Sequence, residues 1–77
     1  MKCTISTATK TTVIDEIAKV TVPTPSGQIE IRPGHAEYYG ATTEGVLVVT
    51  DKDSKEGKYS LVSGICAVKK DIITILQ

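Results

Sequence analysis

Apolar and polar residues alternate with a period of two along several short stretches of this chain. The stretches are residues 19–22, 28–32 and 59–61. Because successive side chains of a β-strand point to opposite faces, this alternation predicts strands with one buried and one solvated face. Two further runs, 46–49 and 72–76, are apolar at nearly every position and are short enough to be strands covered on both faces.

Turn-forming residues separate these runs at short intervals. Residues 23–27 (PTPSG) end one predicted strand, and the polar residues 51–58 lie between two strong ones, which indicates a long hairpin. Residues 69–71 (KKD) form a tight polar link between a strand at 65–68 and the last apolar run, which indicates a second hairpin. Many short strands with regular turns are typical of a β-sandwich or a small barrel.

The amino-acid composition supports this interpretation, with one exception. Thr, Val and Ile account for 28 of the 77 residues, whereas Leu occurs three times, and β-branched side chains favour strands over helices. The exception is a segment in which Val13, Ile14 and Ile17 have helical spacing around two acidic residues. This spacing allows a single helical turn, which is too short and too poorly capped to be stable alone.

The length of 77 residues predicts one small domain, residues 1–77, with a thin core. Lys and Arg together number nine, as do Asp and Glu, so no strongly basic surface is expected. Tyr38, Tyr39 and Tyr59 are the only aromatic residues. A protein that binds nucleic acid normally has a basic stripe, and also stacking aromatics if it binds single strands. We therefore expect no nucleic-acid partner.

Two features of the sequence bear on compartment and cofactors. No apolar run approaches the roughly 18 residues that span a bilayer, and the first residues contain no apolar segment of signal-peptide length, so we expect a protein on the cytoplasmic side. Cys3 and Cys66 form no C-x-x-C pair and are expected to be reduced, buried or edge thiols. With one histidine they cannot complete a structural zinc site without a carboxylate, and we expect no metal and no cofactor.

The segment 27–36 (GQIEIRPGHA) is the most informative part of the chain. It consists of an alternating strand that runs directly into a Pro-Gly turn and presents His35. Pro33 favours the second position of a β-turn and Gly34 supplies a positive φ at the third, which predicts a type II turn over residues 32–35. His35 has no serine or cysteine nucleophile and no third triad member at a recognisable spacing, so we expect no catalytic site.

This segment resembles the Gly-x-Leu/Ile-Gly-Ile-x-Pro-Gly-His-Ala-Pro signature of the epsilon subunit of F-type ATP synthases. Residues 20–27 are similar to the strand and loop that precede the signature in that family, and residues 44–49 to its Gly-Met/Val-Leu-x-Ile strand. Residues 59–76 resemble the closing Tyr-x-Val-x-Gly-Gly-x-x-x-Val-x-x-Asn-x-Val-Thr-Val-Leu segment. The four segments keep the order of the family and cover nearly the whole chain, which makes the resemblance far more specific than any one of them.

The sequence departs from the family pattern at several positions. Glu30 replaces the glycine between the two apolar signature positions, Glu37 replaces the proline after His-Ala, and Ser63 replaces the first glycine of the closing segment. A glycine missing from a strand can mean the loss of a close backbone approach, so the chain is a divergent member or meets a different neighbour at Glu30. Family members usually continue into a helical hairpin, whereas this sequence stops at Gln77. The hairpin's inhibition of ATP hydrolysis and its ATP sensing therefore cannot be carried over to this chain, whether the hairpin is trimmed from the sequence or naturally absent.

The resemblance implies an all-β fold: a two-sheet antiparallel β-sandwich of about eight to ten short strands, with the termini near one another. It also implies a non-catalytic central-stalk (rotor) subunit of a proton- or sodium-translocating F-type ATP synthase. Such a subunit couples the gamma subunit to the membrane-embedded c-ring and turns with both. It would be peripheral, held only through the complex at the cytoplasmic face of the cell membrane or the equivalent organelle side.

The resemblance further suggests which residues contact partners. In the family, the loop around the signature faces the polar loops of the c-ring, which places Gln28 in the contact position. Arginine and aromatic residues often anchor interfaces, although the alternative for the two adjacent tyrosines is that they only cover a thin core. The predicted partner interface contains Gln28, Glu30, Arg32, His35, Tyr38 and Tyr39.

A second interpretation from a different class stays open, because a fold alone does not fix a function. The substituted signature glycine and the missing hairpin are also compatible with a free-standing β-sandwich or small-barrel binding module that has no motor role. A small hydrolase would need a catalytic constellation that the sequence lacks. An oligonucleotide-binding barrel would need a basic groove with exposed aromatics.

Overall fold

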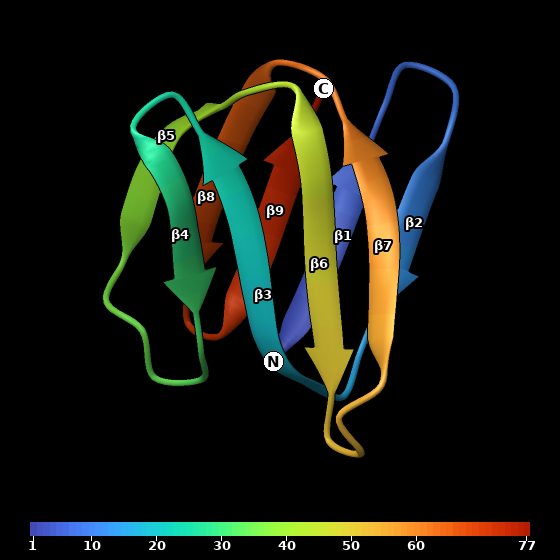
Figure 1. The fold of residues 1–77 in the computed structure, drawn as a ribbon, viewed down its shortest axis with the longest axis vertical. Helices are drawn as coiled ribbons and strands as arrows, with labels where there is room; N and C mark the ends of the chain where they lie inside the picture. The colour runs from blue at the N-terminus through green and yellow to red at the C-terminus, as the bar shows by residue number, and fades with distance from the viewer.

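The computed structural model describes residues 1–77, which form nine β-strands and no helix. The strands are β1 (Lys2–Ser6), β2 (Thr11–Ile14), β3 (Ile17–Thr24), β4 (Gly27–Ile31), β5 (Tyr38–Thr42), β6 (Gly45–Asp51), β7 (Glu56–Leu61), β8 (Gly64–Lys69) and β9 (Ile72–Leu76). One sheet has five strands in the order β2-β1-β9-β8-β5, and the other has four in the order β4-β3-β6-β7. The two sheets stack face to face (Figure 1), which confirms the predicted all-β, two-sheet sandwich. None of its segments is a helix able to cross a membrane.

All strand pairs are antiparallel except one. β1 and β9 run parallel, from Lys2 beside Ile72 to Ser6 beside Leu76. Parallel neighbours begin at the same end of a sheet, so the chain starts at one end of the sandwich and finishes at the other (Figure 1). The Gln77 N–H donates to the Ser6 carbonyl at 2.9 Å, which fixes the last residue beside the end of β1. The expectation that the two termini lie near one another is therefore wrong.

The predicted turns fall close to where the sequence places them, with two exceptions. The loop predicted over residues 51–58 is shorter, because β7 already begins at Glu56, and residues 13–17 do not form a helical turn. Both hairpins form, one between β6 and β7 and one between β8 and β9. Residues 11–14 extend as a strand, and the chain reverses at Glu16, whose φ is 58°. The Asp15 Oδ1 atom accepts a hydrogen bond from the Glu16 N–H at 2.8 Å. A tight turn therefore replaces the helical turn that the spacing allowed, because pairing with β1 draws this segment into the sheet.

A single apolar core fills the space between the sheets. It contains Cys3, Ile5, Ile17, Val20, Val22, Ile31, Leu47, Val49, Leu61, Cys66, Val68, Ile73 and Ile75. These side chains recur at every second strand position, as the alternation predicted, except in β3, where an irregularity separates Ile17 from Val20 by three positions. Both cysteines are free and fully buried, as expected for reduced structural thiols.

The outer face of the five-stranded sheet carries most of the exposed apolar side chains. Five of the seven large exposed hydrophobic residues lie on it, namely Val13, Tyr39, Ile65, Ile72 and Leu76. We call these five residues the outer apolar face. The prediction that the run 72–76 is covered on both sides is wrong, because a two-layer sandwich covers only the inner face of each sheet. For the same reason Val46, on the other sheet, is 46% exposed.

Candidate partner interface

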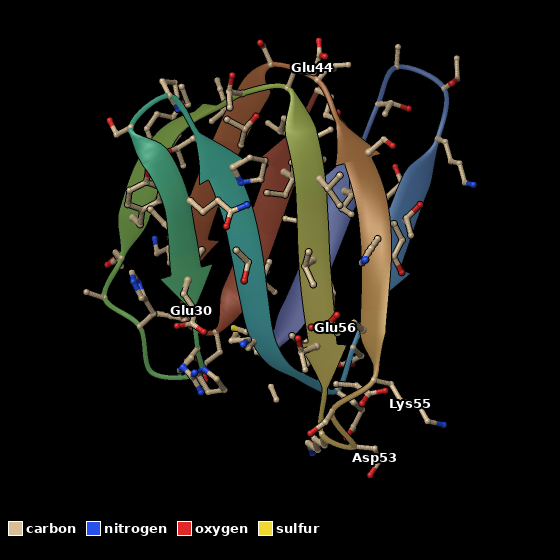
Figure 2. All side chains as sticks on the ribbon, in the orientation of Figure 1. Glu30, Glu44, Asp53, Lys55 and Glu56 are labelled. Atoms are coloured by element: carbon tan, nitrogen blue, oxygen red, sulfur yellow. The ribbon has the colours of Figure 1, made fainter.

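The signature segment forms an edge strand followed by a tight turn. β4 pairs only with β3, at the margin of the four-stranded sheet. Ile31 is fully buried and Ile29 packs against the core, so the alternate residues Gln28 and Glu30 point outward. Gln28 and Glu30 are accordingly exposed, and Figure 2 shows Glu30 at the end of β4 on the surface of the molecule. The alternation in this segment therefore places its polar residues on one solvated face.

The turn that follows β4 has the geometry that Pro33 and Gly34 predict. The His35 N–H donates to the Arg32 carbonyl at 3.1 Å, and the φ of Gly34 is +82°. A Cβ atom added at Gly34 would meet nothing within 4 Å, so the glycine is required by the backbone conformation and not by lack of space. The His35 Nδ1 lies 2.7 Å from the Ala36 carbonyl oxygen, which can only accept, so Nδ1 carries the proton in this contact.

Glu30 lies between two cations. Its Oε1 atom is 3.2 Å from the Lys19 Nζ on the neighbouring strand and 3.1 Å from the Arg32 Nη2. The hydrogen bond from Lys19 is the largest of the effects that lower the pKa of this carboxyl, and the charge of Arg32 adds to it. The three groups together carry a net positive charge at the edge of the sheet. Lys19 was not predicted from the sequence, because its contact depends on the pairing of β3 with β4.

The two adjacent tyrosines have different environments. They lie on β5, where successive side chains point to opposite faces of the sheet. Tyr38 packs against the core, and its ring covers the space beside Gly40, where a Cβ atom would collide with it. Tyr39 is 75% exposed and belongs to the outer apolar face. The structure therefore favours a core-covering role for Tyr38 and leaves Tyr39 free for a contact.

The six predicted interface residues thus do not form one patch. Gln28, Glu30, Arg32 and His35 follow one another along β4 and its turn, whereas Tyr39 lies on the outside of the other sheet. The remaining members of the outer apolar face were missed by the sequence prediction. The available signal was the run 72–76, whose apolar residues exceed what one buried face of a strand needs.

One end of the outer apolar face is cationic. Lys2 and Lys69 flank Ile72 on the neighbouring strands, and Lys70 follows in the β8–β9 turn. None of these three lysines has a carboxylate within 4.0 Å. A shallow hollow of about 340 Å³ opens beside them, with Ile72 and Lys69 in its lining. No group of three or more His, Cys, Asp or Glu side chains is arranged to hold a metal ion.

The comparison with protein families decides the membership of this chain. The family model of the ATP synthase delta/epsilon chain β-sandwich domain matches residues 1–77. The chain belongs to this family. The match confirms the resemblance found in the four ordered segments of the sequence. A comparison with curated protein sequences found no match.

Solved structures show the same family fold. A chain of the Euglena gracilis mitochondrial ATP synthase, in a structure of its OSCP, F1 and c-ring, is similar with a TM-score of 0.88 and 21% identity, over 97% of this chain and 48% of that one. A chain from the central stalk and c-ring of the Tetrahymena thermophila mitochondrial ATP synthase has a TM-score of 0.75 and 17% identity, over 99% of this chain and 63% of that one. This chain therefore spans between about half and just under two thirds of these relatives.

Proposed function

We propose that this chain is the β-sandwich of a central-stalk (rotor) subunit of a proton- or sodium-translocating F-type ATP synthase, coupling the gamma subunit to the c-ring. The match of the family model over residues 1–77 is the observation that carries this proposal. Both solved structures reported above come from ATP synthase assemblies that include the c-ring, which supports the same role. The role is mechanical and non-catalytic, and the subunit is held peripherally at the cytoplasmic face of the cell membrane or its organelle equivalent.

The polar residues around the signature suit a contact with the c-ring. Gln28, Arg32 and His35 are exposed along one edge and one end of the sandwich. Glu30 is already neutralised by Lys19 and Arg32, so this edge presents a net positive charge to its partner. Hydrogen-bonding and charged groups of this kind fix orientation more than they supply affinity.

The outer apolar face suits a contact with the gamma subunit. Contiguous exposed apolar residues on a soluble protein mark interaction sites, and tyrosine is among the residues that most often anchor them. Tyr39, Ile65 and Ile72 lie on three neighbouring, hydrogen-bonded strands of one sheet. A contact spread over paired strands resists shear better than a contact made by a loop, which is what transmission of torque requires.

Calorimetric binding of the 77-residue chain to the gamma subunit of the same organism tests the proposal. We expect a one-to-one complex of micromolar affinity or tighter. Ile72→Asp should weaken it at least tenfold, because a charge would be buried in the contact. Val46→Asp is the matched control, since Val46 is 46% exposed and Ile72 is 47% exposed, on the outer faces of different sheets. Absence of binding by a folded chain would favour the free-standing binding module instead.

A further inference from the structure

Asp71 joins three segments that are far apart in the sequence. It is the second residue of the two-residue turn between β8 and β9. Its side-chain Oδ1 atom accepts a hydrogen bond from the Gly34 N–H at 2.8 Å, across 37 positions of the chain. Its main-chain carbonyl accepts a second hydrogen bond from the Lys2 N–H at 3.0 Å. Figure 1 shows the loop after β4 and the β8–β9 turn at the same end of the sandwich.

The hydrogen bond to Gly34 is the one that ties the signature turn to a distant part of the fold. Residues 32–37 belong to no strand and are all exposed. The other hydrogen bonds of this segment are local, from His35 to Arg32, between His35 and Ala36, and from Arg32 to Glu30. An ionised acceptor makes such a bond stronger than a neutral one. Without it, the segment would be held only where it leaves β4 and where it enters β5.

The backbone at position 71 restricts which residue can make this bond. The φ of Asp71 is +61°, and that of Lys70 is +50°. Among residues with a side chain, aspartate and asparagine tolerate this left-handed conformation best. Both also carry an oxygen that can accept the Gly34 N–H. Position 71 therefore needs a residue that tolerates a positive φ and also carries a hydrogen-bond acceptor.

We propose that Asp71 is a positioning residue that fixes the signature turn relative to the outer apolar face. The inference rests on the proposed function, because it assigns a task to the two surfaces named there. Gly34 lies in the turn after β4, a strand of the four-stranded sheet. Asp71 directly precedes Ile72, the first residue of β9 in the five-stranded sheet. One hydrogen bond thus connects the turn that would meet the c-ring with the strand that would meet gamma. A rotor subunit needs this connection, since a loose turn would absorb part of the rotation.

Two substitutions distinguish loss of the hydrogen-bond acceptor from a change in the backbone conformation of the turn. Asp71→Gly removes the carboxylate and keeps a residue that adopts a positive φ freely, while Asp71→Asn keeps both the acceptor and the tolerance of this φ. Lys70→Gly is the matched control, because it removes a side chain at the other left-handed position of the same turn. The first measurement is hydrogen exchange of the Gly34 amide by NMR in the 77-residue chain. The second is the affinity for a complex of gamma and the c-ring from the same organism.

We expect the Gly34 amide to exchange about tenfold faster in Asp71→Gly than in the natural chain, and to stay protected in Asp71→Asn and Lys70→Gly. The affinity should fall about tenfold in Asp71→Gly and remain within about twofold in Asp71→Asn. Unchanged Gly34 exchange in Asp71→Gly would overturn the hydrogen bond itself. Faster exchange with unchanged affinity would overturn the positioning role and leave the proposed function standing. A folded natural chain that does not bind at all would overturn the proposed function, and the exchange measurement would still report on the hydrogen bond.

Discussion

Ile72 and Ile73 are neighbours in the chain but lie on opposite sides of the same sheet. Ile73 is fully buried between the two sheets, whereas Ile72 is 47% exposed on the outer apolar face. Both belong to β9, which lies between β1 and β8 in the five-stranded sheet. The two identical side chains therefore have different roles. Ile73 stabilises the fold, and under the proposed function Ile72 contributes to binding.

Substitution of these two residues should separate the two tasks. Ile73→Ala leaves a cavity in the core and should lower the free energy of unfolding by about 2–5 kcal/mol. Ile72→Ala should lower it by no more than about 1 kcal/mol. Urea unfolding followed by circular dichroism measures both values. If Ile73→Ala does not fold, Ile73→Val should still cost about 0.5–1.5 kcal/mol, and equal effects at 72 and 73 would contradict the assignment of faces.

Gly34→Val should destabilise the protein by about 1–3 kcal/mol, because a β-branched residue adopts a positive φ only with strain. Space is not the reason, since nothing lies within 4 Å of an added Cβ atom. Gly34→Asn is the control, and its cost should be smaller because asparagine tolerates this region of φ. Urea midpoints compare the three proteins. A midpoint for Gly34→Val equal to that of the natural chain would show that the turn assignment is wrong.

The Glu30 carboxyl should titrate below its usual pKa, because Lys19 and Arg32 stabilise its charged form. A lowered folded-state pKa stabilises the fold above the unfolded-state pKa of glutamate, and this contribution is lost as the pH falls through the folded-state pKa. Carbon-detected NMR of the glutamate side chains measures the titration. Lys19→Gln should raise the Glu30 pKa, whereas Lys58→Gln, which removes a lysine without a carboxylate partner, should leave it unchanged.

The buried thiols should make the protein sensitive to alkali. Burial raises the pKa of Cys3 to about 12, with a further contribution from Cys66, and raises the pKa of Cys66 to about 11. A raised folded-state pKa gives stability that is complete below the ordinary thiol value of 9.0 and is lost as the pH rises towards 11 and 12. Urea unfolding between pH 8 and pH 11 should show a shallower decline in Cys66→Ala than in the natural chain. Parallel curves would mean that the thiols do not contribute.

The same burial should protect both thiols from modification. Only the thiolate reacts, and little of it forms at pH 8 when the pKa is raised. A thiol reagent added to the folded chain should therefore react at a rate set by unfolding. In concentrated urea, two thiols per chain should react rapidly. Fast labelling of the folded chain at pH 8 would contradict the burial of these residues.

Gln28→Lys should leave the fold intact and weaken assembly onto the c-ring that the proposed function requires. Gln28 is exposed on the outer face of an edge strand, so a longer polar side chain can extend into water. Ser60→Lys is the matched control, because Ser60 is exposed on β7, the opposite edge strand of the same sheet. Thermal unfolding and binding to detergent-solubilised c-ring provide the two readouts. Unfolding of Gln28→Lys would make Gln28 a structural residue and remove it from the interface.

Local patterns predicted most of the strands and turns, but not β1, β2 or β5, and not how all of the strands pair. The hairpin at residues 69–71 was predictable because it depends on a few consecutive residues. The parallel pairing of β1 with β9 was not, because the two strands are about 70 positions apart and either direction buries the same alternate residues. Val13 and Ile14 are a local case, because their helical spacing was outweighed by hairpin pairing with β1, the preceding strand. Pairing between strands, which the pattern of a single segment does not specify, therefore accounts for both errors.

Sequence patterns predicted parts of six of the nine strands, most of the turns and the resemblance to a family, whereas β1, β2 and β5 were not predicted as strands. These properties depend on the period-two alternation, on residues such as Pro33 and Gly34, and on the order of four segments. The shared exposed face of Ile72 and Tyr39, and the hydrogen bond that Asp71 accepts from the Gly34 N–H, became visible only in the folded structure. The physical reason is that side-chain surroundings depend on which distant strands become neighbours, and the period of one strand does not specify its partner.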